Sequence, residues 1–224
     1  LIKVNLDIKF ALPKQTMEQL QQDVQTALSF NPTHLSYYHL TLEPNTYFHR
    51  YPPTLPDDDL ALDMQAYIEA ELENAGMKHY EVSAFAKAGH ESVHNTNYWQ
   101  FGDYIGIGAG AHGKISAHDG ITRYSKFKHP QTYLTEIANG SAVESETRVQ
   151  RDELPFEFML NALRLHDGVK MSHFQAATGL TVADLEPALS TAIERGLMVR
   201  QHDVLRVTDL GWRFMSDVQE LFLK

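Results

Sequence analysis

The stretch Val4-Asn5-Leu6-Asp7-Ile8-Lys9-Phe10, with Leu12-Pro13 directly after it, decides the fold class. Its apolar and β-branched residues predict a strand, and the proline predicts the end of that strand. Thr16 is placed to cap a helix that runs to about Ser29. The apolar positions of this helix recur at helical spacing, at Met17, Leu20, Val24, Ala27 and Leu28. A strand followed at once by a helix is the first half of a βαβ unit.

The same alternation continues along the next eighty residues. His34–Leu42 predicts a second strand, and Pro56-Asp57-Asp58-Asp59 begins a second helix that runs to about Asn74. Lys78–Ala84 predicts a third strand and Tyr104–Gly108 a fourth. Strands that alternate with helices indicate parallel βαβ units, and three or four units without closure predict part of a (β/α) barrel. Acids in a first turn suit the helix dipole, which favours capping over metal binding for the three aspartates.

After Gly140 the pattern becomes mainly helical. The predicted elements are helices over Asp152–Leu165, Ser172–Thr178 and Thr181–Arg195, a hairpin of Met198–Arg200 with Val204–Val207, and a helix from Thr208 to about Phe222. A helix–turn–helix followed by a hairpin is typical of a winged helix. The candidate recognition helix carries Asp184, Glu186 and Glu194 against Arg195, which favours a packing module over a DNA-binding one. We expect two domains, residues 1–140 and 141–224.

Composition excludes several classes of protein. The 224 residues are 43% hydrophobic and 21% charged, enough for a sizeable core. The net charge of −10 argues against a nucleic-acid partner, which would require a basic stripe. No apolar run is long enough to span a membrane, and no signal peptide begins the chain, so we expect a cytoplasmic protein.

The chain contains no cysteine. This excludes disulfides, thiol catalysis and cysteine-held iron–sulfur clusters on this chain. The strand pattern that begins at Leu1 requires neighbouring strands, because parallel strands are buried on both faces. We therefore expect that further sequence precedes Leu1.

A glycine-rich run, Gly108-Ala109-Gly110-Ala111-His112-Gly113, matches G-x-G-x-x-G. A dinucleotide site needs a helix directly afterwards, whereas Lys114–Gly120 has the pattern of a strand and turn. We reject a dinucleotide site. The glycines still permit a ligand to approach the backbone at the end of a strand, where α/β barrels place their sites.

The run His94-Asn95-Thr96-Asn97-Tyr98-Trp99 just before it combines a histidine, two amides and two aromatics. Histidine is the commonest side-chain metal ligand, and flat aromatics beside it suit a planar ligand such as a porphyrin. The alternative is a loop histidine with a Tyr-Trp pair buried in the core. These residues alone leave both interpretations open.

Several motifs together resemble one family. Asn5–Ile8 with Leu12–Thr16 resembles the N-[IL]-D-L-x-x-G-L-P-x-Q strand of the oxygen-independent coproporphyrinogen oxidase-like radical S-adenosylmethionine (SAM) proteins. Further segments resemble the HemW branch of that family, namely Leu35–Thr46, Tyr80–Ala86, His94–Trp99, Phe101–Gly113, Pro155–Asn161 and Glu220–Leu223. The family's three-cysteine motif is missing, so the chain resembles only the C-terminal part. Lys9 and Ala11 also depart from the family's usual apolar residue and glycine.

The resemblance implies a C-terminal part of a partial radical-SAM barrel followed by a HemN-like, winged-helix-like C-terminal domain. It implies a haem chaperone that delivers haem to haem-accepting proteins. The alternative is a coproporphyrinogen III oxidase-like oxidoreductase of porphyrin biosynthesis. Porphyrinogen propionates would require basic residues, and the barrel part offers few, among them Lys9, Lys14, Arg50, Lys78 and Lys87. Family proteins use SAM and a [4Fe-4S] cluster, so this cysteine-free chain is expected to be inactive in radical chemistry by itself.

The resemblance also implies roles for individual residues. Asp7, Thr41 and His112 match positions that contact SAM. His94 matches the haem-associated residue and is a candidate iron ligand. Its neighbours would orient or shield the haem, namely Asn95 or Asn97, Tyr98 and Trp99. Homodimer formation and peripheral contact with membrane haemoproteins stay open.

Overall fold

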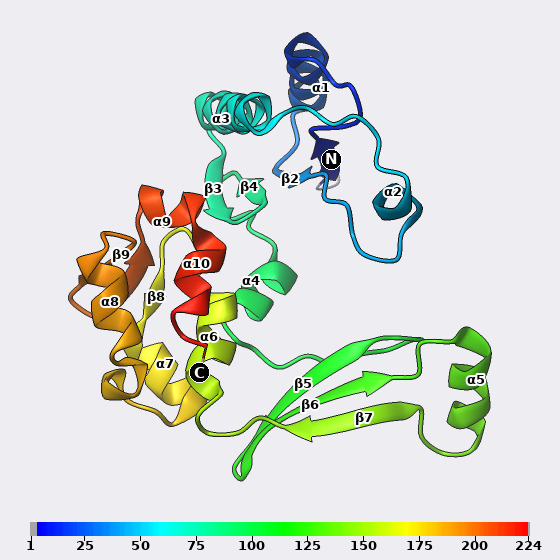
Figure 1. Cartoon of the computed structure of the whole chain (residues 1–224), viewed down its shortest axis with the longest axis vertical. Coiled ribbons are helices and arrows are strands. Elements are labelled where there is room, and N and C mark those ends of the chain that lie inside the picture. Colours follow the sequence, from blue (N-terminus) through cyan, green and yellow to red (C-terminus); the bar gives the residue numbers. More distant parts are fainter. Residues whose placement is uncertain (1–3, 224) are drawn as a thin grey trace. The chain divides into compact units, whose positions relative to one another are not determined.

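The computed structural model describes residues 4–223, which divide into two compact units, residues 4–92 and residues 93–223. The two units are coloured blue to green and green to red in Figure 1. The domain boundary predicted at residues 140 and 141 follows the change of pattern in the sequence and stays a prediction.

The first unit is built on a four-stranded sheet with the order β1-β2-β4-β3. β1 (Asn5–Phe10) and β2 (His34–His39) pair in parallel, with Leu6 opposite Leu35, as the sequence predicts. The predicted third strand is wrong in one respect. It is a hairpin of β3 (Lys78–Glu81) and β4 (Ala84–Ala86), and β4 pairs antiparallel with both β2 and β3. The described residues therefore contain no closed barrel.

Local capping signals position the helices of this unit. α1 (Met17–Ser29) begins at Thr16, whose side chain forms a capping box with Gln19. α3 (Asp58–Asn74) begins at Asp57, whose carboxylate accepts a hydrogen bond from Leu60 N, so the predicted capping role is confirmed for this aspartate. A short helix, α2 (Tyr47–Arg50), was not expected from the sequence. The core between α1, α3 and the sheet comprises Leu20, Val24, Leu35, Met64, Ile68 and Leu72 among others.

The second unit begins with α4 (Val93–Trp99) and an antiparallel sheet. Its strands are β5 (His112–Ala117), β6 (Gly120–Lys126) and β7 (Val143–Arg148), with α5 (Pro130–Ala138) between the last two (Figure 1). The strand predicted over Tyr104–Gly108 is wrong, because only a single bridge joins Tyr104 to Lys114. The strand and turn predicted after the glycine run are confirmed by β5 and β6.

The remainder of this unit is mainly helical around a small sheet. Its elements are α6 (Leu154–Ala162), β8 (Val169–Lys170), α7 (Met171–Thr178), a 3-10 helix (Val182–Leu185), α8 (Ala188–Glu194), β9 (Met198–Gln201), β10 (Val204–Val207), α9 (Asp209–Arg213) and α10 (Met215–Glu220). The helix–turn–helix and hairpin are confirmed. The helix predicted over Thr181–Arg195 is divided at Pro187, and the helix predicted from Thr208 to about Phe222 is divided at Phe214. Phe158 and Phe174 lie at the centre of the core. No helix within residues 4–223 is both long and apolar enough to cross a membrane.

Candidate functional site

The six-residue run of His, Asn and aromatics forms most of α4, and none of that helix is buried. His94 and Tyr98 are four residues apart and therefore share one face. Their ring centroids lie 4.8 Å apart in an edge-on arrangement. The ring centroids of Tyr98 and Tyr104 lie 4.3 Å apart. We call His94, Tyr98 and Tyr104 the aromatic row; it has an exposed imidazole at one end.

The environment of the aromatic row differs between its ends. Tyr98 and Tyr104 are half-buried, and burial followed by the neighbouring Tyr104 phenol raises the pKa of Tyr98. His94 is exposed, and within residues 4–223 neither of its ring nitrogens makes a hydrogen bond. An imidazole with both nitrogens available to a ligand is able to bind a metal through one of them.

Trp99 follows the aromatic row on the same helix. Its ring lies under the guanidinium of Arg164, with 4.9 Å between the guanidinium carbon and the ring centroid. Such a cation–π contact contributes about 0.5–1 kcal/mol at a partly exposed position. Trp99 and Tyr98 are partly exposed, so they are not the buried core pair that the alternative interpretation predicts.

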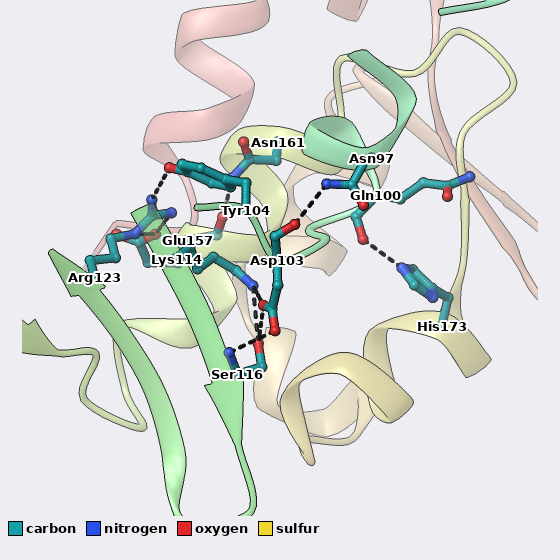
Figure 2. Close-up of polar contacts among 10 residues, drawn as sticks. All are labelled: Asn97, Gln100, Asp103, Tyr104, Lys114, Ser116, Arg123, Glu157, Asn161 and His173. Atoms are coloured by element: carbon teal, nitrogen blue, oxygen red, sulfur yellow. Dashed lines mark hydrogen bonds and ion pairs between the residues drawn. The ribbon is translucent and has the colours of Figure 1, made fainter. Parts of the chain in front are cut away.

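The C-terminal end of α4 is held by a tight turn (Figure 2). Phe101 has a left-handed backbone conformation with a φ of 60°, and the centroid of its buried ring lies 5.4 Å from that of Phe158. A Cβ on Gly102 would lie 2.1 Å from Asn97 Oδ1, so only glycine fits there. Asn97 Nδ2 donates to Asp103 O at 3.0 Å, and Gln100 O contacts His173 Nε2 at 2.7 Å. Asn97 thus holds this turn, and nothing places it against the imidazole of His94.

An ion pair with a buried lysine follows this turn, and no pattern in the sequence marks it. Lys114, 1% exposed, donates from Nζ to Asp103 Oδ1 at 2.9 Å and to Ser116 Oγ at 3.1 Å. The same ammonium lies 4.2 Å from the centroid of the Phe101 ring. Burial alone would raise the pKa of Asp103, but hydrogen bonds from Lys114 and Ser116 outweigh it and hold the pKa below its usual value.

A second polar cluster holds Tyr104 at the inner end of the aromatic row. Arg123 on β6 donates from Nε to Glu157 Oε2 on α6 at 2.8 Å. Its Nη1 reaches Tyr104 Oη at 3.4 Å (Figure 2). Asn161 Nδ2 donates to the Glu157 backbone carbonyl at 2.8 Å. No sequence pattern marks these residues, because their elements are brought together only by the tertiary fold.

The residues predicted to contact SAM lie in both units. Asp7 is exposed on β1, and Thr41 follows β2 and donates to Glu43 Oε1 at 2.7 Å. Both belong to the first unit. His112 is the exposed first residue of β5 in the second unit. Their roles stay predictions.

The residues present fit some cofactors and not others. The chain has no cysteine, so it does not fit a cysteine-held cluster, and we derive no step through one. Within residues 4–223 no three His, Asp or Glu side chains gather to hold a metal ion. A planar ligand whose metal is bound by one imidazole fits these residues better than a cluster does. The aromatic row offers the imidazole of His94 next to the rings of two tyrosines. The carboxylate of Asp7 fits the hydroxyl and ammonium donors of SAM.

Comparison with known proteins supplies independent information. Residues 149–214 match the family model of the HemN C-terminal domain. The chain is 42% identical to "Heme chaperone HemW" of Haemophilus influenzae and 43% identical to that of Escherichia coli, in each case over 98% of this chain. It is 34% identical to the Bacillus subtilis protein of the same name, also over 98% of this chain. These alignments cover 56%, 57% and 59% of the three relatives, so the chain spans little more than half their length.

The fold of the chain is similar to part of a solved structure. Coproporphyrinogen III oxidase (HemN) from Escherichia coli, a radical SAM enzyme, is similar with a TM-score of 0.77 and 19% identity. The similarity covers 97% of this chain and 54% of that structure. At this identity the comparison concerns the fold alone.

Proposed function

Because this chain belongs to the HemW family of radical SAM, HemN-like proteins and corresponds to their C-terminal part, we propose that it carries the haem-binding surface of a haem chaperone. One observation carries the proposal. The exposed imidazole of His94 makes no hydrogen bond within residues 4–223 and stands at the end of the aromatic row.

We assign haem-binding roles to four residues of α4. A neutral nitrogen of His94 would ligate the haem iron. Tyr98, in ring contact with His94, would pack against the porphyrin. Asn95 and Trp99 lie on the same short helix and would contact the edges of the haem. An exposed surface with one iron ligand favours release, which a protein that hands haem to acceptors requires.

The first unit contributes a second binding element to the proposal. We assign the exposed carboxylate of Asp7 to SAM, where it would accept hydrogen bonds from ribose hydroxyls or the amino group. Thr41 and His112 remain proposed contacts. With no cysteine in the chain, reductive cleavage of SAM by this chain alone is not expected.

The distribution of basic side chains favours haem binding over porphyrinogen oxidation. Two of the basic residues of the barrel part contact uncharged groups. Lys87 Nζ donates to Asn31 Oδ1 at 2.7 Å, and the Arg50 guanidinium lies over the Tyr51 ring at 5.4 Å. The basic residues of this part are few for the several propionates of a porphyrinogen substrate.

A haem titration followed by absorbance tests the proposal. We expect saturable binding with the spectrum of histidine-ligated haem, and at least tenfold weaker binding by His94→Ala. His118→Ala is the matched control, because His118 is also exposed but lies at the turn between β5 and β6. Equal loss in both variants, or no loss in His94→Ala while circular dichroism shows both folded, would overturn the assignment of the iron ligand. Transfer from the loaded chain to an apo-haemoprotein, measured by the same absorbance, tests the chaperone role.

A further inference from the structure

A series of hydrogen bonds joins the loop residue Ser92 to three strands of the first unit, β3, β2 and β1, and ends on Asp7. Ser92 N donates to Tyr80 Oη at 3.2 Å, and Tyr80 Oη contacts His34 Nε2 at 2.8 Å. The other ring nitrogen, His34 Nδ1, lies 2.6 Å from Asn5 Oδ1. Asn5 Nδ2 then donates to Asp7 Oδ1 at 3.1 Å. We call Ser92, Tyr80, His34, Asn5 and Asp7 the polar relay.

The chemistry of the donors gives the relay one direction. Asn5 Oδ1 is only an acceptor, so the proton of a neutral His34 ring must sit on Nδ1. His34 Nε2 is then an acceptor, and the Tyr80 hydroxyl must donate to it. The hydroxyl oxygen accepts from Ser92 N at the same time. Every bond therefore points from Ser92 toward the Asp7 carboxylate.

Burial keeps the His34 ring in the protonation state that this direction requires. His34 is 8% exposed and Tyr80 is 7% exposed. Burial lowers the pKa of His34, and the nearby carboxylates of Asp7 and Glu91 offset only part of that effect. The ring is therefore neutral at pH 7 and present in a single tautomer, because the other tautomer would set two acceptors against each other.

We infer that Asn5 is a positioning residue for Asp7, and that His34 and Tyr80 determine which end of the Asn5 amide faces the carboxylate. With the amide reversed, its carbonyl oxygen would face the carboxylate and repel it. In the observed orientation Asp7 Oδ1 is held, and among the described residues nothing donates to Oδ2. Oδ2 is thus presented to a ligand that carries hydroxyl or ammonium donors. This inference rests on the proposed role of Asp7 in binding SAM.

Nitrogen-15 NMR of the whole chain tests the relay without a ligand. We expect the His34 ring in the Nδ1–H tautomer, and shifts of both the His34 nitrogens and the Asn5 side-chain amide in Tyr80→Phe. Tyr37→Phe is the matched control, because Tyr37 is also a buried tyrosine of this sheet but its hydroxyl makes no hydrogen bond within residues 4–223. Unchanged His34 and Asn5 resonances in Tyr80→Phe would overturn the relay.

Calorimetric titration with SAM itself tests its consequence. We expect Asp7→Asn to bind at least tenfold more weakly, Asn5→Ala about tenfold and Tyr80→Phe about threefold more weakly, with Tyr37→Phe unchanged; tenfold corresponds to the worth of one charge-assisted hydrogen bond. If Asp7→Asn loses affinity while Asn5→Ala does not, the positioning role is wrong and the ligand role stands. If Asp7→Asn binds like the parent chain, or the parent does not bind, the ligand role fails and the NMR result alone decides the relay.

Discussion

The Lys114 ammonium lies 2.9 Å from the Asp103 carboxylate, yet only the lysine is buried, with side-chain exposures of 1% and 41%. Removing one partner should therefore change the free energy of unfolding by a different amount from removing the other. Asp103→Ala leaves a buried cation without its counter-charge and should lower the free energy of unfolding by about 3–5 kcal/mol. Lys114→Met leaves a carboxylate that water can reach, and should lower it by about 1–2 kcal/mol.

Urea unfolding followed by circular dichroism measures both changes. Asp119→Ala is the control, because Asp119 and Arg148 form an exposed pair at 3.7 Å whose loss should change stability by about 1 kcal/mol or less. Equal losses in Asp103→Ala and Lys114→Met would mean that the pair acts through packing and not through uncompensated charge.

Stability should depend on pH through His34. Burial lowers the pKa of this imidazole in the folded state from the ordinary 6.5. Above pH 6.5 the ring is neutral in both states and the full stability is present. As the pH falls below that value the unfolded chain binds the proton first, so the free energy of unfolding decreases until the folded pKa is reached.

Urea titrations of the parent chain and of His34→Gln between about pH 7.5 and pH 5.5 measure this dependence. The parent should lose stability more steeply on acidification than the variant, which lacks the titrating ring. Parallel profiles would show that His34 does not carry the effect.

Two tyrosines of one sheet should respond oppositely to the same substitution. The Tyr37 hydroxyl is buried, and within residues 4–223 it makes no hydrogen bond. Removing an unsatisfied buried group in Tyr37→Phe should stabilise the chain by about 1 kcal/mol. Tyr80→Phe instead removes the partner of His34 Nε2 and Ser92 N, and should destabilise it by about 1–2 kcal/mol. A midpoint of urea unfolding that moves in the same direction for both variants would contradict this account.

The parts of the fold that could be predicted from sequence depend on local signals. Thr16 and Asp57 mark helix starts because a cap is made with a residue three positions away. The parallel pair of β1 and β2 follows from the helix between them. The β3–β4 hairpin could not be predicted, because β4 is a three-residue strand whose pairing with β2 is a long-range contact.

In the candidate site, too, local features could be predicted from the sequence and long-range contacts could not. His94, Tyr98 and Trp99 stand out because they are close together in the sequence. Once α4 forms, these three side chains lie on the surface of one short helix. The residues that hold that surface do not stand out. Arg123 and Glu157 are 34 positions apart and meet only when β6 packs against α6.

The glycine run supplies the last prediction. A Cβ on Gly106, which is buried, would lie 2.2 Å from the backbone oxygen of His112, and backbone does not move aside cheaply. Gly106→Ala should disturb the Tyr104–Lys114 bridge and the hydrogen bond from Gly106 N to Tyr124 Oη at 2.9 Å, lowering the free energy of unfolding by about 3 kcal/mol. Gly108→Ala is the matched substitution. Gly108 has open space around it and a φ of 109°, so an alanine there meets only backbone strain of about 1–2 kcal/mol. Urea unfolding of the two variants separates the causes, since a larger loss in Gly108→Ala would show that the run needs glycine for its backbone conformation and not for close packing against β5.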